Sequence, residues 1–278
     1  MIKSASQLKG KIKNLANGDV RKAETLMRIF FMERFIERVS VSEYREKFIL
    51  KGGMLTSSLL GIDMRTTMDI DTTVRSLPLT DEDIQRIIAE IISIQLDDGI
   101  SFKIVSTERI MDEFDYPGIK VHLEGVLEGI RQPIKIDVST DDVITPGAIE
   151  YEYKLMFEDR TIKLLSYNTE TLLAEKVQTI IARGIANTRM RDFYDVYMIV
   201  LDVDFSWDIL KEAFRATCQK RSTDYSDERV SRELELIDKD AKLEADWNKF
   251  KKKNFFAETL EWRTVIDSIE DSIKKVVS

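Results

Sequence analysis

The spacing of apolar residues changes along the chain and divides it into helical and strand-forming regions. Residues 1–45 are expected to be helical, because apolar positions between Glu24 and Ile36 recur at steps of three and four and form one buried face. Between residues 47 and 165, short apolar or alternating runs separated by turns favour strands. From Thr169 onward the helical spacing returns.

One helix is expected among the strands of the central region. Thr80 caps it, Asp83 occupies its third position, and its apolar stripe ends near Asp98. The other elements predicted up to residue 165 are strands at 47–51, 69–74, 101–105, 119–123, 133–138, 151–157 and 162–165, and a short helix at 54–60. Further helices are predicted at about 169–183, 190–201, 207–219, 226–241 and 257–276. The pattern predicts an α+β fold, with N-terminal helices and a small mixed-sheet core at 1–165 and a helical C-terminal domain at 166–278.

Composition excludes several classes of protein. The chain has 278 residues, of which 43% are hydrophobic and 33% charged, as is usual for a globular protein. Its one cysteine, Cys218, rules out an intrachain disulfide framework and a four-cysteine zinc site, and favours a reducing compartment. No apolar run reaches membrane-spanning length, and the N-terminus lacks the apolar core of a signal peptide. We therefore expect a cytoplasmic protein with no membrane partner and, without an obvious exposed apolar helix face, a monomer.

The single histidine restricts the chemistry that the chain can perform. His122 falls on the polar side of a predicted strand with Lys120 and Glu124, where a solvated histidine is expected. Histidine-dependent triads and histidine-rich metal sites are thereby excluded, so catalysis must rest on carboxylates, lysines and arginines. A net charge of −8 argues against broad coating of nucleic acid but permits a local basic patch.

Three aspartates are the candidate metal ligands. Asp69 and Asp71 point to the same side of a predicted strand, and Asp137 lies on the polar side of another. Adjacent carboxylates repel each other unless a cation joins them, and Mg²⁺ suits carboxylates combined with phosphate oxygens. Three carboxylates are the usual minimum for two-metal transfer of a phosphoryl or nucleotidyl group.

A phosphate-binding turn is expected upstream of the acidic pair. Gly52 and Gly53 follow an apolar strand and precede a helix, so backbone N–H groups can approach a phosphate closely. Arg65 offers a bidentate phosphate contact. A Gly-Gly pair or an Asp-x-Asp sequence is common alone, but the ordered set of both with the later Asp137 strand is far more specific.

These segments resemble the signature of the nucleotidyltransferase superfamily. The residues that carry the resemblance are Leu50-Lys51-Gly52-Gly53-Met54-Leu55 and Arg65-Thr66-Thr67-Met68-Asp69-Ile70-Asp71. Within that superfamily the chain is similar to the AbiEii/AbiGii toxin family of bacterial abortive-infection and type IV toxin–antitoxin systems. The 15 residues between Gly53 and Asp69 exceed the spacing in many superfamily members and fit this branch.

Two downstream motifs extend the resemblance, which covers roughly residues 45–200. Lys176 resembles the lysine of one family motif, and Asp192 and Asp195 resemble the acids of another. The resemblance favours Asp192 as an active-site acid that positions Lys176 or the attacking group. Lys176 also falls inside an apolar helix stripe, where an ammonium group needs a partner, although it can instead reach solvent from the stripe's edge. The alternative for the acids is an ordinary Arg191–Asp195 pair with a solvated Asp192.

The resemblance implies a magnesium-dependent enzyme with an NTP as substrate. Asp69, Asp71, Lys176 and Asp192 would be catalytic, Gly52, Gly53, Arg65 and Lys176 would hold the NTP, and Asp69, Asp71 and Asp137 would bind the metal. The implied acceptor is RNA, above all the 3′ end of tRNA, with growth arrest as the outcome and a separately encoded antitoxin opposing it. A protein-nucleotidylating enzyme and a non-catalytic NTP-binding module are the alternatives. The basic run Lys249–Lys253 is more simply a solvated helix face than an RNA contact.

Overall fold

The computed structural model describes residues 1–77, 80–110 and 118–278, and these form two compact units. The first unit comprises Met1–Ser58, Thr66–Asp142 and Ile149–Ser166. The second comprises Leu59–Arg65, Val143–Ala148 and Tyr167–Ser278. Two short segments that precede Tyr167 thus belong to the mainly C-terminal unit.

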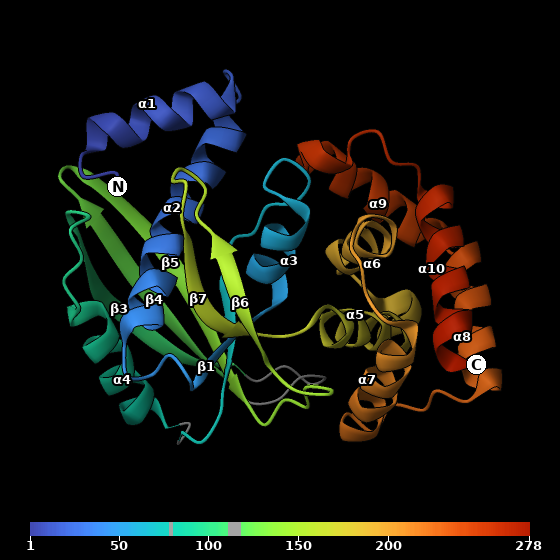
Figure 1. The fold of residues 1–278 in the computed structure, drawn as a ribbon. Helices are drawn as coiled ribbons and strands as arrows, with labels where there is room; N and C mark the ends of the chain where they lie inside the picture. The colour runs from blue at the N-terminus through green and yellow to red at the C-terminus, as the bar shows by residue number, and fades with distance from the viewer. Residues whose placement is uncertain (78–79, 111–117) are drawn as a thin grey trace. The chain divides into compact units, whose positions relative to one another are not determined.

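In the described part of the chain, the first unit is built on a seven-stranded mixed sheet (Figure 1). The strands are β1 (Phe48–Lys51), β2 (Ile70–Val74), β3 (Ile100–Ile110), β4 (Gly118–Leu127), β5 (Ile130–Thr140), β6 (Ile149–Lys154) and β7 (Thr161–Ser166). Their order across the sheet is β3-β4-β5-β2-β1-β7-β6. Strands β2 and β5 are parallel, as are β1 and β7, and the other neighbours are antiparallel. The predicted α+β class with a mixed sheet is confirmed.

One face of the sheet is apolar and the other polar. On β4 and β5 the side chains of Val121, Leu123 and Ile136 are buried, whereas the alternate residues Lys120 and Lys135 are more accessible. Successive residues of a strand point to opposite faces, so the alternation in the sequence becomes one buried and one polar surface.

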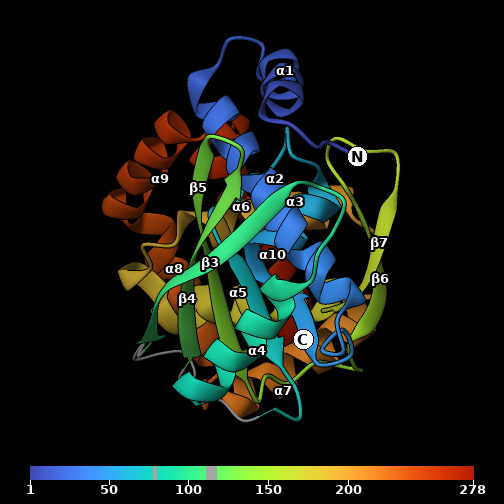
Figure 2. The ribbon, with the colours of Figure 1, turned by 90° about the vertical axis from the view of Figure 1, so that its left-hand side faces the viewer.

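Two helices cover the apolar face, α2 (Val20–Val41) and α4 (Asp81–Ser93) (Figures 1 and 2). A Cβ added to Gly125 of β4 would lie 2.4 Å from a ring carbon of Phe31, so α2 packs directly on the strand. Helix α4 begins as predicted, with the Thr80 hydroxyl accepting a hydrogen bond from the Asp83 N–H.

Helix α2 is buried on most of its sides and carries buried charges. Arg38 donates to both carboxylate oxygens of Asp98, at 2.8 and 3.0 Å. Glu33 is 1% exposed and accepts the Met156 N–H at 2.9 Å through Oε1, while its Oε2 is buried with no partner among the described residues. Burial raises the pKa of Glu33 to about 8, despite the opposing charge of Arg34.

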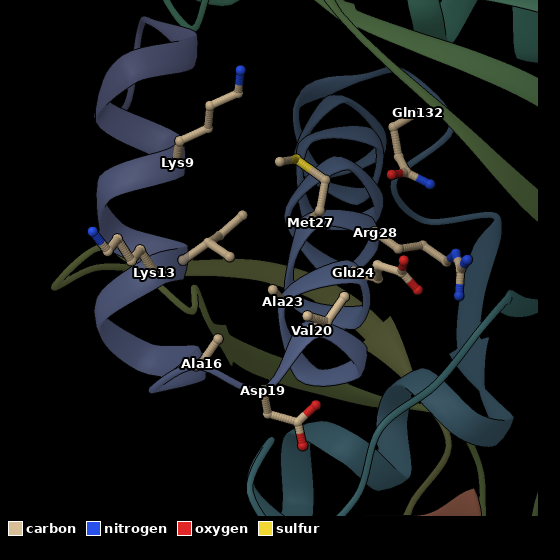
Figure 3. A pocket seen from close by; sticks show the side chains of 12 residues that line it. Lys9, Lys13, Ala16, Asp19, Val20, Ala23, Glu24, Met27, Arg28 and Gln132 are labelled. Atoms are coloured by element: carbon tan, nitrogen blue, oxygen red, sulfur yellow. The ribbon is translucent and has the colours of Figure 1, made fainter.

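A groove of about 560 Å³ lies between α2 and α1 (Ala5–Ala16) (Figure 3). Lys9 and Lys13 of α1 line it on one side, and Val20 and Met27 of α2 line it on the other. None of the candidate site residues is among the residues that line this groove, so it is not the predicted active site.

The second unit is helical in the part of the chain that the structure describes. Its helices are α5 (Thr169–Arg183), α6 (Met190–Asp202), α7 (Trp207–Lys220), α8 (Asp227–Lys239), α9 (Ala241–Lys253) and α10 (Trp262–Val277), with short 3₁₀ turns at Gly184–Ala186 and Phe255–Ala257. Aromatic rings form part of its core: the centroids of Tyr194 and Phe256 are 4.9 Å apart, and those of Trp247 and Trp262 are 5.8 Å apart.

Several predicted boundaries are wrong. Helix α4 ends at Ser93 rather than near Asp98, and α10 begins at Trp262 rather than at residue 257. Helix α9 was not among the predicted helix ranges, although the basic run at its end was interpreted as a helix face. Only Leu243 and Trp247 of its residues are buried, so its apolar periodicity is weak. Asp240 separates it from α8 by capping its first turn, accepting the Leu243 N–H at 2.8 Å. The strand predicted at 151–157 ends at Lys154, because the chain then turns back into β7.

Across residues 1–77, 80–110 and 118–278, no helix combines the length and apolar character that crossing a membrane would require.

Candidate active site

The turn between β1 and α3 (Gly52–Leu60) depends on glycine at position 52. Gly52 has a φ of +58°, in the left-handed region, and a Cβ added there would lie 2.2 Å from Asp71 Oδ2. The Gly53 N–H donates to the same oxygen at 2.8 Å. The predicted phosphate-binding turn therefore lies directly beside the second carboxylate of the acidic pair.

The sheet places Asp137 beside Asp71. The two residues are register partners on the parallel strands β2 and β5, and Asp69 lies two positions before Asp71. Burial raises the pKa of Asp137 to about 6, and the charges of Asp71 and Asp69 add to the effect against the opposing charge of Lys120. The three aspartates are thus electrostatically coupled.

The chemistry of this trio fits a divalent cation. Asp137 Oδ1 is buried and has no hydrogen-bond partner among the described residues. An unpaired buried carboxylate oxygen is costly, and a hard cation with oxygen ligands would satisfy it. The described residues include no ready-made cluster of three His, Cys, Asp or Glu residues arranged for a metal. The roles of Asp69, Asp71 and Asp137 as ligands remain a prediction.

Two lysines of the same face were not identified as site residues from the sequence. Lys51 is the register partner of Asp71 on β1, and Lys120 is the partner of Asp137 on β4. Lys120 Nζ lies 3.7 Å from Asp137 Oδ2, while Lys51 Nζ lies 2.5 Å from Asp142 Oδ2. Lys120 was visible as a polar-face residue, but its alignment with Asp137 depends on strand pairing that the sequence does not display.

In the second unit Lys176 is buried between two carboxylates. Its Nζ donates to Asp192 Oδ1 at 3.0 Å and to Asp195 Oδ2 at 2.7 Å. Burial alone would lower the pKa of Lys176, but Asp195 and Asp192 raise it above its ordinary value, so the ammonium stays charged. Lys176 is 8% exposed, so the alternative in which it reaches solvent is wrong.

Arg65 belongs to the same cluster. Its Nε donates to Asp195 Oδ1 at 2.7 Å and its Nη2 donates to Asp195 Oδ2 at 3.1 Å. Asp195 is fully buried, so it is not part of an ordinary surface pair with Arg191. Burial raises the pKa of Asp195, but Arg65 and Lys176 outweigh burial and hold it below its usual value. The guanidinium of Arg65 thus anchors Asp195, and its contact with a phosphate remains a prediction.

The basic run near the end of α9 forms ion pairs within the second unit. Lys249 Nζ lies 2.8 Å from Asp246 Oδ1, and Lys251 Nζ lies 2.7 Å from Glu261 Oε1. These pairs agree with the simpler interpretation of the run as a solvated helix face.

Comparison with known proteins identifies the family. The model of the AbiEii nucleotidyl transferase toxin family, a type IV toxin–antitoxin family, matches residues 34–268. A search of curated protein sequences gave no significant match.

Solved structures support the same fold. MenT4, a nucleotidyltransferase toxin from Mycobacterium tuberculosis H37Rv, matches with a TM-score of 0.59 and 14% identity over 97% of this chain and 99% of that chain. JHP933 from Helicobacter pylori matches with a TM-score of 0.53 and 14% identity over 91% of each chain. The family match covers most of the chain, and the fold agrees with it. The protein therefore belongs to the AbiEii family and is a nucleotidyltransferase toxin of a type IV toxin–antitoxin system.

Proposed function

We propose that the protein transfers a nucleotide from an NTP to an RNA acceptor, specifically the 3′ end of tRNA, in a magnesium-dependent reaction. The family supplies the reaction class, an NTP as substrate and the existence of an antitoxin. The choice of acceptor rests on the resemblance of the motifs around Gly52, Asp69 and Lys176.

One observation carries the metal-dependent part of the proposal. Asp137 Oδ1 is buried and has no hydrogen-bond partner in the part of the chain that the structure describes. Asp137 is in register with Asp71, which lies beside the Gly52–Gly53 turn. This arrangement concentrates negative charge next to a turn that suits phosphates. When bound, magnesium would offset charge on the phosphate oxygens and activate the acceptor hydroxyl.

The chain's own groups take distinct roles in this proposal. Asp69, Asp71 and Asp137 supply oxygen ligands, and backbone N–H groups of the glycine turn approach the phosphates. Lys176 neutralises charge on the nucleotide, and Asp192 orients its ammonium through the 3.0 Å hydrogen bond.

The test is a transfer assay with each α-labelled NTP in turn, total RNA and magnesium. The Asp69→Ala/Asp71→Ala variant is compared with the wild type, and Asp159→Asn, an exposed carboxylate in the β6–β7 connection, is the matched control. We expect label in the tRNA band with the wild type and the control, loss of that label in the double variant, and loss on chelation with EDTA.

The alternatives give different outcomes of the same assay. Label that migrates with protein would replace RNA by a protein hydroxyl as acceptor. Absence of label in RNA and protein with every NTP would contradict the proposed reaction and favour an NTP-binding module.

We also propose that the transfer arrests growth, serves abortive infection by phage, and is performed by a monomer. Induced expression of the wild type, but not of Asp69→Ala/Asp71→Ala, should stop growth. Light scattering should give the mass of one chain, and a dimer mass would contradict the monomer.

A further inference from the structure

A cationic strip lies on the polar face of β3, β4 and β5. Its side chains are Lys103, Lys120, His122, Arg131 and Lys135. The side chains of Lys103 and Arg131 are 59% and 67% exposed, and Lys135 is exposed as well. The chain as a whole has a net charge of −8, so the strip is opposite in sign to the whole chain.

The acidic side chains of this face do not cancel the strip. Glu124 accepts from Arg131 at 2.9 Å and lies 2.9 Å from Lys103 Nζ, so one carboxylate faces two cations. Glu108 is shared with His122, whose Nε2 is 3.1 Å from its Oε1. Asp137 lies 3.7 Å from Lys120 Nζ and is a third carboxylate of this face. With His122 neutral, the four Lys or Arg residues and the three carboxylates leave a formal charge of +1. Among the described residues, no carboxylate lies within ion-pair distance of Lys135.

The strip begins next to the carboxylates and leads away from the glycine turn. Across β4, β5, β2 and β1 the register aligns Lys120, Asp137, Asp71 and Lys51 in one row. The glycine turn follows Lys51 at one end of this row, and Lys120 occupies the other end. Asp137 and Asp71 therefore lie between the turn and the strip.

The order of turn, carboxylates and strip matters because the geometry of the reaction restricts the side from which the acceptor can approach. In transfer at phosphorus the attacking and leaving oxygens are roughly in line. If the pyrophosphate leaves on the side of Gly52 and Gly53, the acceptor must approach from the opposite side, over β5 and β4. A nucleic-acid acceptor brings phosphates with it, and these need cations along that approach.

We propose that the cationic strip is the docking surface for the acceptor, and that Lys120 and Lys135 contact backbone phosphates of a single-stranded RNA 3′ segment. The inference rests on the proposed function, which it extends by assigning the acceptor a path. Residues 135 and 137 of β5 are roughly 7 Å apart along the strand, so the two lysines meet successive parts of an extended backbone. None of the five strip residues is Phe, Tyr or Trp, so binding depends on charge and is tolerant of sequence.

The experiment measures binding of a fluorescently labelled, mixed-sequence single-stranded RNA by anisotropy, without NTP. Lys120→Ala/Lys135→Ala is compared with the wild type and with Lys9→Ala/Lys13→Ala, a matched pair of exposed lysines on α1. Loss of two phosphate contacts lowers the slope of log affinity against log salt by about 1.4 for single strands. Between 50 and 200 mM salt the wild type should then lose about sevenfold more affinity than the strip variant.

Single variants and stability measurements separate binding from folding. Lys135→Ala alone alters an exposed side chain, and it should produce about half of the decrease in the slope of log affinity against log salt. Thermal unfolding should give the same midpoint for Lys135→Ala and the wild type. The control pair on α1 should bind RNA with wild-type affinity and salt dependence.

The outcomes distinguish this inference from the proposed function. Loss of RNA binding in the strip variant, with no transfer by the wild type to any acceptor, would support the surface and refute the reaction. Transfer to RNA with an unchanged KM for RNA in the strip variant would refute the surface and leave the reaction intact. Equal loss of affinity in the α1 control, or no RNA binding by the wild type, would also overturn the inference.

Discussion

Asp195→Asn is expected to lower the free energy of unfolding of the second unit by about 3–5 kcal/mol, the usual cost of breaking a buried ion pair. Asp195 is 0% exposed and accepts three hydrogen bonds, two from Arg65 at 2.7 and 3.1 Å and one from Lys176 at 2.7 Å. Asparagine keeps the volume but removes the charge. Arg65, which is 3% exposed, then loses the carboxylate that faces it, and the amide can direct an N–H group toward a cation.

Asp192→Asn is the matched comparison within the same cluster. Asp192 accepts one hydrogen bond from Lys176 at 3.0 Å, and Lys176 keeps Asp195 when Asp192 loses its charge. The free energy of unfolding should therefore fall by only about 0.5–1.5 kcal/mol, the usual net value of one hydrogen bond. Nucleotidyl transfer should fall in both variants, because both change the surroundings of Lys176.

Tryptophan fluorescence during urea unfolding is the appropriate assay, because Trp207, Trp247 and Trp262 are all in the second unit. The midpoint and slope of each curve give the free energy of unfolding. An Asp195→Asn variant as stable as Asp192→Asn would refute the conclusion that Asp195 neutralises two buried cations.

The pH dependence provides an independent check. Burial raises the pKa of Asp195, but Arg65 and Lys176 lower it below the unfolded value of 3.8. A depressed carboxylate pKa stabilises the folded state fully above the unfolded pKa, and this stabilisation is lost as pH falls through the folded pKa. The difference between wild type and Asp195→Asn should therefore be constant at neutral pH and shrink below about pH 3.8.

Three further predictions concern the first unit. Gly52→Ala should abolish transfer, because its Cβ would displace Asp71, and wild-type transfer by this variant would contradict the role of the turn. The same change should lower the free energy of unfolding by roughly 1–2 kcal/mol, the cost of left-handed backbone for alanine. The folded state keeps the Glu33 proton between about pH 4.5 and pH 8 while the unfolded state loses it, so the stability of the wild type falls as pH rises over that range, and Glu33→Gln should remove this decline. Urea unfolding followed by circular dichroism should show that the variant gains more free energy of unfolding over the wild type at pH 8 than at pH 4.5, and an equal gain at both would refute a neutral buried Glu33. Saturating magnesium at 100 times its Kd should stabilise the wild type by about 2.7 kcal/mol but not Asp137→Asn, and equal thermal shifts in the two proteins would exclude Asp137 as a ligand.

Much of the fold follows from local pattern. Helix α5 spans Thr169–Arg183 as predicted, because Asn168 caps it and its apolar residues recur at helical spacing. Helix α9 was missed because few of its side chains are buried, so tertiary contacts with the rest of the second unit, rather than periodicity, define it.

Site residues could be placed from the sequence only where the alternation of side chains along a single strand was sufficient. A period of two predicted Asp69 and Asp71 on one side of a strand and Asp137 on a polar face. Strand β2 begins at Ile70, so Asp69 lies just before the strand and the predicted start at residue 69 is wrong. Register across the sheet is set by long-range pairing, so the direct alignment of Asp71 with Asp137 was not visible in the sequence. The same holds for Arg65, whose partner Asp195 is 130 residues further along the chain.

The two charge clusters differ in how well their charges are balanced, and this difference bears on their roles. In the second unit two cations, Arg65 and Lys176, face two carboxylates, Asp192 and Asp195, in surroundings that are almost dry. The charges of this cluster balance without a ligand, so in the proposed function a phosphate that approaches Lys176 would compete with a carboxylate. Asp192 is the weaker competitor, because it makes one hydrogen bond to Lys176 and its side chain is 14% exposed, whereas Asp195 is also fixed by Arg65. The trio around Asp137 has the opposite character, with a buried oxygen that lacks a partner among the described residues and a pKa raised to about 6. In the proposed function the trio would gain stability from a cation, whereas Lys176 would exchange one anion for another.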